Sequence, residues 1–188
     1  MLDAVELLKT RRSVKPRDMT GPGPTPQELE TILTIGSRVP DHGRVTPWRF
    51  IVFEGEARNK ASALIADIFV RKNPEAAEED IDRARKALSN APLVIAVVSS
   101  PREHPKVPPW EQELSAGASA MSLVIAANAL GYVANWLTTW FAFDRDVMTA
   151  FGLKPEERFA GFIHIGSVDQ KPEDRARPAL ADIVTRFG

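Results

Sequence analysis

The stretch from Trp110 to Leu130 constrains the fold of this chain more than any other, because it predicts one long helix crowded with small side chains. The small residues in its interior are Ser115, Ala116, Gly117, Ala118, Ser119, Ala120, Ala126, Ala127 and Ala129. Small side chains let neighbouring backbones approach closely, and larger apolar residues lie between them. Gly131 supplies a C-terminal stop. We therefore expect a central helix that is buried on most sides.

Three apolar runs are predicted to be strands. They are Phe50 to Phe53, Leu93 to Val98 and Phe159 to Ile165. Short runs rich in β-branched and aromatic residues are typical of buried strands. Helical patterns separate these runs without a regular alternation, which favours an α+β domain over an alternating α/β sheet. At 188 residues, the chain fits one domain over residues 1–188.

Capping signals place further helices along the chain. Asp3 is expected to cap a first helix that ends at Pro16, and Thr25 with Glu28 forms a capping box that opens the second. A charged helix is expected from Glu75 to about Ser89. Its acidic residues followed by basic ones indicate an exposed face with helical ion pairs, so we assign it no catalytic role.

Charge and composition argue against several classes of partner. Lys plus Arg number 24 and Asp plus Glu number 25, so a formal net charge of −1 gives no general surface for nucleic acid or an anionic membrane. The absence of cysteine excludes disulfides, thiolate catalysis and iron–sulfur clusters, and it fits a reducing compartment. Neither a secretory signal nor an apolar run long enough to span a bilayer is visible, so we expect a cytoplasmic protein.

Motifs of several enzyme classes are missing from the sequence. No Gly-x-Gly-x-x-Gly follows a strand, and neither a Walker sequence nor a Gly-x-Ser-x-Gly is present. A metal site would need ligands such as Asp41, His42 and His104. No His-x-x-x-His pair or clustered carboxylates accompany them, so we expect no metal site.

Three cationic clusters and one aromatic segment remain as candidates for binding. The clusters are Arg11 to Lys15, Arg38 to Arg44 and Lys171 to Arg177, and the aromatic segment is Trp136 to Thr139. Guanidinium groups and hydroxyls bind phosphate or carboxylate oxygens, and tryptophan stacks on flat rings. A solvated basic helix end and ordinary core tryptophans are the alternative explanations. Together, the four segments suit a ligand that is anionic at one end and flat at the other, as FMN is.

Five short motifs, taken in their order along the chain, carry a resemblance to a known family. They are Arg11-Arg12-Ser13 with Lys15, Arg38-Val39-Pro40-Asp41-His42 with Thr46-Pro47-Trp48, Val107 to Glu113 leading into Ser115-Ala116-Gly117, Gly131 to Trp136, and Arg177-Pro178. In this order and spacing, the sequence resembles the FMN-dependent nitroreductase family, in particular its short single-domain bacterial members. The resemblance implies a nitroreductase-like α+β fold, with a central antiparallel or mixed sheet surrounded by helices and a long buried central helix.

The resemblance further implies a domain-swapped homodimer with an FMN in each of two sites at the interface. The residues implied at the cofactor are Arg11, Arg12, Ser13, Lys15 and Arg177 at the phosphate and ribityl end, Arg38 and His42 on the flavin, and Trp136, Leu137 and Thr138 against the isoalloxazine ring. Many members carry Asn and Gln where this chain has Gly43, Arg44 and Thr46. We therefore expect the 43–46 segment to govern substrate preference.

The activity implied by the resemblance is ping-pong hydride transfer. NAD(P)H reduces the flavin and leaves, and a small electron-poor acceptor such as a nitroaromatic or a quinone takes its place. Because the flavin performs the redox chemistry, we expect no catalytic side chain. The alternatives are a specialised flavin enzyme, such as an enone or halogenated-metabolite reductase or an enzyme that consumes its flavin, and a non-catalytic FMN-binding or anion-binding protein.

Overall fold

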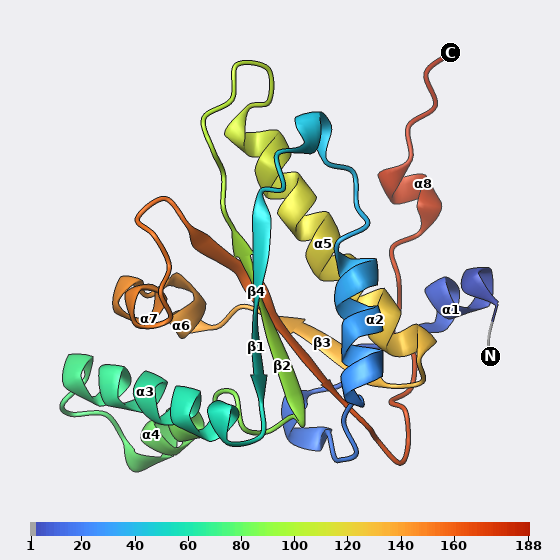
Figure 1. Cartoon of the computed structure of the whole chain (residues 1–188). Coiled ribbons are helices and arrows are strands. Elements are labelled where there is room, and N and C mark those ends of the chain that lie inside the picture. Colours follow the sequence, from blue (N-terminus) through green and yellow to red (C-terminus); the bar gives the residue numbers. More distant parts are fainter. Residues whose placement is uncertain (1–2) are drawn as a thin grey trace.

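The computed structural model describes residues 3–188 and contains a four-stranded sheet at its centre (Figure 1). The strands are β1 (Trp48–Glu54), β2 (Leu93–Ser99), β3 (Val133–Leu137) and β4 (Arg158–Gly166). Their spatial order is β1-β2-β4-β3, and each neighbouring pair is antiparallel. Residues 1–2 of the expected 1–188 domain lie outside the described residues.

Helices cover both faces of this sheet (Figure 1). On one face lie α2 (Pro26–Gly36) and α5 (Pro109–Ala129). On the other lie α3 (Glu56–Lys72), α4 (Glu78–Arg85), α6 (Trp140–Phe143) and α7 (Arg145–Ala150). The remaining short helices are α1 (Ala4–Thr10), α8 (Leu180–Ile183), and the 3-10 turns η1 (Pro16–Asp18) and η2 (His42–Arg44). The predicted α+β fold is confirmed.

Strand β2 separates the hydrophobic core into two clusters. All seven of its residues are buried, as its near-continuous apolar sequence predicts for a strand covered on both faces. The side chains that pack in the cluster with α5 are Leu93, Ile95 and Val97. Those that pack in the cluster with α3 and α6 are Val94, Ala96 and Val98. This alternation follows from the two-residue period of a strand.

Helix α5 confirms the predicted central helix, and each of its ends lies one residue from the predicted bound. It crosses α2 at Gly36, where the hydroxyl of Ser119 donates to the Gly36 carbonyl oxygen at 2.7 Å. A Cβ at Gly36 would lie 2.8 Å from Cγ of the buried Leu123. The small residue at this crossing therefore permits the close approach of the two helices. Helix α2 itself begins with the predicted capping box of Thr25 and Glu28.

The first helix is shorter than predicted. The expected end at Pro16 is wrong, because α1 ends at Thr10. The chain then becomes extended, and Ser13 forms a parallel bridge with Ala134 in β3. Pairing with the sheet edge therefore ends the helix before the proline is reached.

The charged fourth helix is also shorter than the predicted 75–89 range, since α4 spans Glu78–Arg85. Acidic residues fill its first turn and basic residues its last, as the helix dipole favours. Beyond it, Leu88 is fully buried, and its N–H donates to the Ser62 hydroxyl at 2.9 Å. The chain leaves its helical conformation before Leu88 enters the core, so α4 ends earlier than the sequence pattern predicts.

Both edges of the sheet differ from the sequence prediction. Strand β3 was not predicted, and the expectation of three strands is wrong. Only Val133 and Ala134 are buried in β3, because it is an edge strand, and it lacks a continuous apolar run. At the other edge, Phe50 to Val52 in β1 are half-buried and not fully buried as expected.

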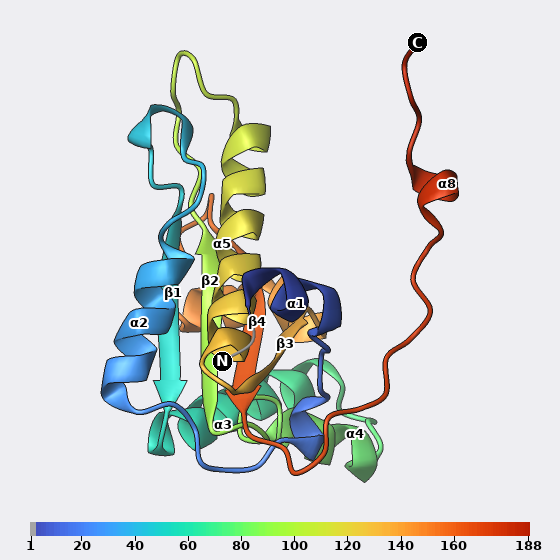
Figure 2. The ribbon, with the colours of Figure 1, turned by 90° about the vertical axis from the view of Figure 1, so that its right-hand side faces the viewer.

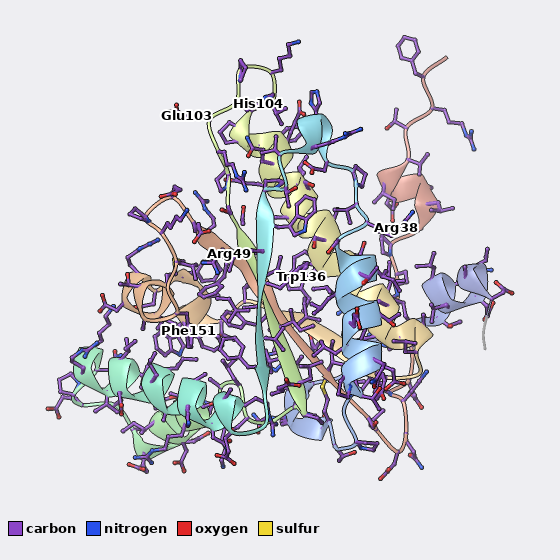
Figure 3. The ribbon with its side chains drawn as sticks, in the orientation of Figure 1. Arg38, Arg49, Glu103, His104, Trp136 and Phe151 are labelled. Atoms are coloured by element: carbon purple, nitrogen blue, oxygen red, sulfur yellow. The ribbon has the colours of Figure 1, made fainter. Side chains whose placement is uncertain are left out.

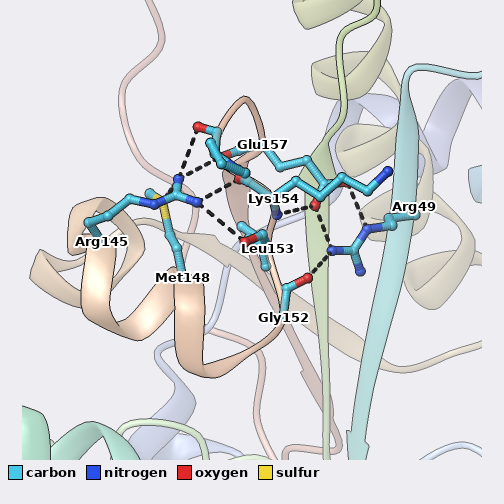
Figure 4. A network of polar contacts seen from close by, with 8 residues as sticks. Arg49, Arg145, Met148, Gly152, Leu153, Lys154 and Glu157 are labelled. Carbon is cyan, nitrogen blue, oxygen red and sulfur yellow. Dashed lines mark hydrogen bonds and ion pairs between the residues drawn. The ribbon is translucent and has the colours of Figure 1, made fainter.

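A polar network fixes the loop between α7 and β4 to the sheet (Figure 4). The Glu157 side chain is 1% exposed and accepts hydrogen bonds from Nε and Nη2 of Arg49 at 2.9 and 2.8 Å. These hydrogen bonds from Arg49, opposed by burial, lower the pKa of Glu157 to about 2. On the other side of the loop, Arg145 donates to the carbonyl oxygens of Leu153 and Glu157. The network therefore has a structural role.

The C-terminal segment leaves the body of the molecule (Figure 2). Residues 169–188 are exposed along their whole length. The large apolar side chains in this segment that are half or more exposed are Leu180, Ile183, Val184 and Phe187. Their spacing is that of the apolar face of a helix. Within residues 3–188, no helix combines the length and the apolar character needed to cross a membrane.

Candidate functional site

The first cationic cluster lies against the edge strand β3. Besides the bridge between Ser13 and Ala134, the Val14 N–H donates to the Ala134 carbonyl oxygen at 3.4 Å. The side-chain amide of Asn135 donates to the Val14 carbonyl oxygen at 2.8 Å. This pairing brings residues 11–13 to the same sheet edge as the aromatic segment 136–138.

The C-terminal cluster meets the N-terminal one around Asp174. Nε of Arg12 donates to the Glu173 carbonyl oxygen at 3.0 Å and lies 3.7 Å from Oδ1 of Asp174. Nη2 of Arg177 donates to the same Oδ1 at 3.0 Å. The Asp174 pKa is lowered, first by a hydrogen bond from the Arg175 N–H and further by Arg177 and Arg12, against the effect of burial. One carboxylate therefore lies between two arginines from opposite ends of the chain.

Arg11 completes this group and has the least favourable environment in it. Its pKa is lowered by burial first, and then by the charges of Arg177 and Arg12. Nη2 makes a long hydrogen bond of 3.4 Å to the Ser13 hydroxyl. Its buried Nε has no hydrogen-bond partner among the described residues. An anion with several oxygens would supply that partner and offset the like charges, so the group fits a phosphate.

Trp136 lies across the sheet with its indole against Gly161. Its Nε1 donates to the Ala160 carbonyl oxygen at 3.0 Å, and a side chain at Gly161 would collide with the indole ring. The far edge of the ring reaches α5, where a Cβ at Gly117 would lie 3.9 Å from it. The indole N–H is therefore used within the protein, and only 37% of the residue is exposed. Trp136 can offer a ligand ring contact but no hydrogen bond.

Leu137 and Thr138 continue the chain at the end of β3. Leu137 is half-buried as the last residue of the strand, and Thr138 is exposed just beyond it. Lys15 is also exposed, and within residues 3–188 its side chain makes no hydrogen bond or ion pair. Lys15 and Thr138 are thus exposed to a ligand, and Leu137 is partly exposed.

The loop after α2 contains Arg38 and His42, and both are exposed. Nδ1 of His42 lies 2.8 Å from Oε2 of Glu111 in the first turn of α5. The Asp41 carboxylate accepts hydrogen bonds from the backbone of the following residues, at 3.0 and 2.9 Å. We call Arg11, Arg12 and Arg177 the Arg11 group. No hydrogen bond or ion pair joins the loop after α2 to this group within the part of the chain that the structure describes. One chain alone therefore brings the Arg11 group next to β3, and Arg38 and His42 are not part of that arrangement.

Sequence reasoning missed three residues that organise these segments: Asp174, Glu111 and Gln112. Asp174 was hidden by the cations around it, although a carboxylate three residues before Arg177 is a signal for a local ion pair. Glu111 and Gln112 lay within a noted motif, but nothing in the sequence identified their partners. The candidate metal ligands are not gathered either, since no group of three or more His, Asp or Glu side chains in residues 3–188 is arranged to hold a metal.

Comparison with known proteins agrees with this fold. The model of the nitroreductase family matches residues 8–167. An Escherichia coli protein named "Putative NAD(P)H nitroreductase YdjA" is 38% identical over 170 residues, which cover 90% of this chain and 91% of that protein.

Two solved structures share the fold. The nitroreductase-like family protein from Bacillus cereus superposes with a TM-score of 0.82 at 24% identity, covering 100% of this chain and 97% of that one. A variant of the FMN- and NADPH-dependent nitroreductase NfnB from Sphigopyxis sp. strain HMH superposes with a TM-score of 0.78 at 19% identity, covering 100% of both chains. From the family match and the identity to YdjA, we conclude that this chain belongs to the nitroreductase family of oxidoreductases.

Proposed function

We propose that this chain is a single FMN-binding domain over residues 1–188 that transfers hydride from NAD(P)H to a small electron-poor acceptor, such as a nitroaromatic or a quinone. The observation that carries the proposal is the group formed by Arg11, Arg12 and Arg177, in which a buried guanidinium nitrogen has no partner among the described residues. The fold it shares with an FMN- and NADPH-dependent nitroreductase supports the same cofactor and reductant.

The residues of this chain would bind the two ends of FMN differently. Arg11, Arg12 and Arg177 would bind the phosphate through charge-assisted hydrogen bonds, and Ser13 would reach the ribityl chain. Lys15 would add positive charge nearby. Because Ser13 is paired with β3, the flat end would extend along Trp136, Leu137 and Thr138. When bound, FMN supplies the two-electron chemistry that no side chain of the site provides.

The proposed site requires a homodimer. Arg38 and His42 make no hydrogen bond or ion pair with the Arg11 group within residues 3–188, so we propose that they reach the flavin of the partner protomer. Apolar side chains near both ends of the chain support a large interface, because Val5, Leu8, Leu180, Ile183 and Phe187 are all more than half exposed. A second chain that covers these side chains would also complete the site.

The chain's own residues bind and orient the reactants in this reaction. A nitro group, one NAD(P)H and one proton give a nitroso group, NAD(P)⁺ and one water molecule. With FMN bound, the guanidinium of Arg38 and the imidazole of His42 would stabilise negative charge on its ring system. No side chain acts as a nucleophile or a general base in this scheme.

The test begins with the absorption spectrum of the purified protein. We expect flavin bands, in the protein as isolated or after incubation with FMN, and we expect NADH or NADPH to bleach them under anaerobic conditions. Bands without bleaching would identify a binding protein instead of an enzyme. A protein that remains colourless with FMN would contradict the proposal, and sedimentation as a monomer at micromolar concentration would contradict the shared site.

A further inference from the structure

Two loops form a lobe at one end of the molecule, beyond the first turn of α5. This entrance lobe comprises residues 42–46 and 101–107, and Figure 3 shows Glu103 and His104 at its tip. The loops meet at Gly43, where the position of a Cβ would lie 3.5 Å from the His104 ring and 3.3 Å from Val107 Cγ2. Two segments far apart in the sequence thus form one surface beside His42.

A buried amide holds the 101–107 loop in place. Gln112 is 1% exposed, and its Oε1 accepts a hydrogen bond from the Arg102 N–H at 2.9 Å. Its Nε2 donates to the carbonyl oxygens of Arg102 and Val107, at 2.8 and 3.0 Å. Because these contacts use only the backbone of Arg102, its side chain is exposed and free to meet a ligand.

The 42–46 loop is also held in a defined and strained conformation. Arg44 and Thr46 have φ angles of 54° and 50°, in a region that residues other than glycine rarely adopt. Two hydrogen bonds to the Asp41 carboxylate, from the N–H groups of Val45 and Thr46, stabilise this turn. Such strain persists where the surroundings hold it, and it concentrates at functional sites. The turn places Arg44 on the exposed surface of the lobe.

The exposed groups of the lobe are predominantly cationic. Arg44, Arg102 and Lys106 carry positive charge, and Glu103 is the one exposed carboxylate among residues 42–46 and 101–107. An open hollow of about 700 Å³ lies along the second loop, and Arg102, His104 and Glu103 line it together with three prolines. Nδ1 of His104 accepts the Lys106 N–H at 3.2 Å, which leaves Nε2 as its protonated, donating nitrogen. The hollow therefore offers a ligand the donors of Arg102 and His104 beside the Glu103 carboxylate, and the lobe as a whole carries more positive than negative charge.

We infer that the entrance lobe selects acceptors that carry a negative charge, such as aromatic nitro compounds or quinones bearing a carboxylate or a sulfonate. This inference rests on the proposed function, because it assigns the substrate class of the same site. His42 belongs to the lobe and is proposed to contact the flavin, so an acceptor above the ring would meet Arg102 and His104 at its outer end. A carboxylate there would gain charge-assisted hydrogen bonds that a neutral ring substituent does not.

The experiment compares three acceptors of similar shape with the FMN-loaded enzyme: 4-nitrobenzoate, the neutral 4-nitrobenzamide and the cationic 4-nitrobenzyltrimethylammonium. We expect kcat/KM to be highest for the anion and lowest for the cation. Raising NaCl from about 10 mM to about 500 mM should reduce the advantage of the anion, because salt screens exposed charges. In Arg102→Gln, we expect the ratio of kcat/KM for 4-nitrobenzoate to that for 4-nitrobenzamide to fall by about threefold or more.

The matched control is Arg71→Gln, which removes an exposed arginine from α3 on the other face of the sheet. It should leave the ratio unchanged. Equal kcat/KM for the anion and the neutral compound in the wild-type enzyme, with no salt dependence, would overturn the inference while the reductase activity stands. If the enzyme reduces none of the three compounds although NAD(P)H bleaches its flavin, the proposed nitro acceptors fail as well. If Arg102→Gln does not fold, the kcat/KM values of the wild-type enzyme for the three acceptors, and their salt dependence, still test the inference.

Discussion

Replacement of Arg11 by methionine should change stability and FMN affinity in opposite directions. In the chain without cofactor, the Arg11 guanidinium is partly buried, is repelled by Arg177 and Arg12, and has an Nε without a partner in the described residues. Arg11→Met keeps an apolar stem of similar length and removes this charge. It gives up only the 3.4 Å hydrogen bond to Ser13, which is long enough to be weak.

The magnitudes follow from these contacts. Removing an unpaired buried donor and its repulsion should stabilise the FMN-free protein by about 1 kcal/mol, which for a chain of this size raises Tm by about 2 to 4 °C. Loss of charge-assisted hydrogen bonds to the phosphate should weaken FMN binding by about 1.5 to 3 kcal/mol, or about 10-fold to 150-fold in Kd.

The assay uses FMN-free protein prepared from both variants. Urea unfolding gives the free energy of unfolding, and quenching of flavin fluorescence on titration gives Kd. Arg71→Met, on the far side of the sheet, is the matched control and should change neither quantity appreciably. An Arg11→Met protein that is less stable without FMN, or that binds FMN with wild-type affinity, would refute the assignment of Arg11 to the phosphate.

Three further predictions concern stability. Glu157→Ala removes the hydrogen bonds between Glu157 and Arg49 and should lower the free energy of unfolding in urea by about 1.5 to 3 kcal/mol, since the Arg49 side chain is 39% exposed and can be solvated in the variant. The pKa of Glu157 is lowered to about 2, so the stability that this pair gives the wild-type protein should be complete above pH 4.5 and should be lost as pH falls toward 2. Burial lowers the pKa of His164 from 6.5 to about 4, so the unfolded chain binds a proton at a higher pH than the folded one. The free energy of unfolding should therefore fall by about 3 kcal/mol as pH drops from 6.5 to about 4. His164→Leu should abolish this decline. Gly36→Ala places a Cβ 2.8 Å from Leu123 Cγ and should lower the unfolding free energy by about 1 to 3 kcal/mol; an unchanged urea midpoint would show that α2 and α5 can separate freely.

The elements that the sequence predicted well are those whose signal is local. The apolar run of β2, the small residues of α5 and the capping box of α2 each require little knowledge of the rest of the chain. The end of α1 and the strand β3 could not be predicted in the same way, because each depends on the other through the bridge between Ser13 and Ala134. Pairing between residues so far apart leaves no pattern within either segment.

The same distinction applies to the candidate site. The types of residue that bind anions were visible as clusters, but their grouping depends on long-range contacts such as those of Arg12 with Glu173 and Asp174. The sequence left two roles for Trp136, packing in the core or contact with a ligand, and the structure is compatible with both. Its N–H is used by Ala160, while part of its ring stays exposed.

The attachment of the 101–107 loop through its backbone determines which of its side chains can be replaced. Gln112 binds only main-chain atoms of the loop, so its contacts place few demands on the side chains of Glu103 and Lys106. Mutations there can alter the charge and shape of the hollow while the sheet, α5 and the Arg11 group remain as they are. A loop attached in this way would let point mutations change the surface that a ligand meets while the packing of the fold is retained.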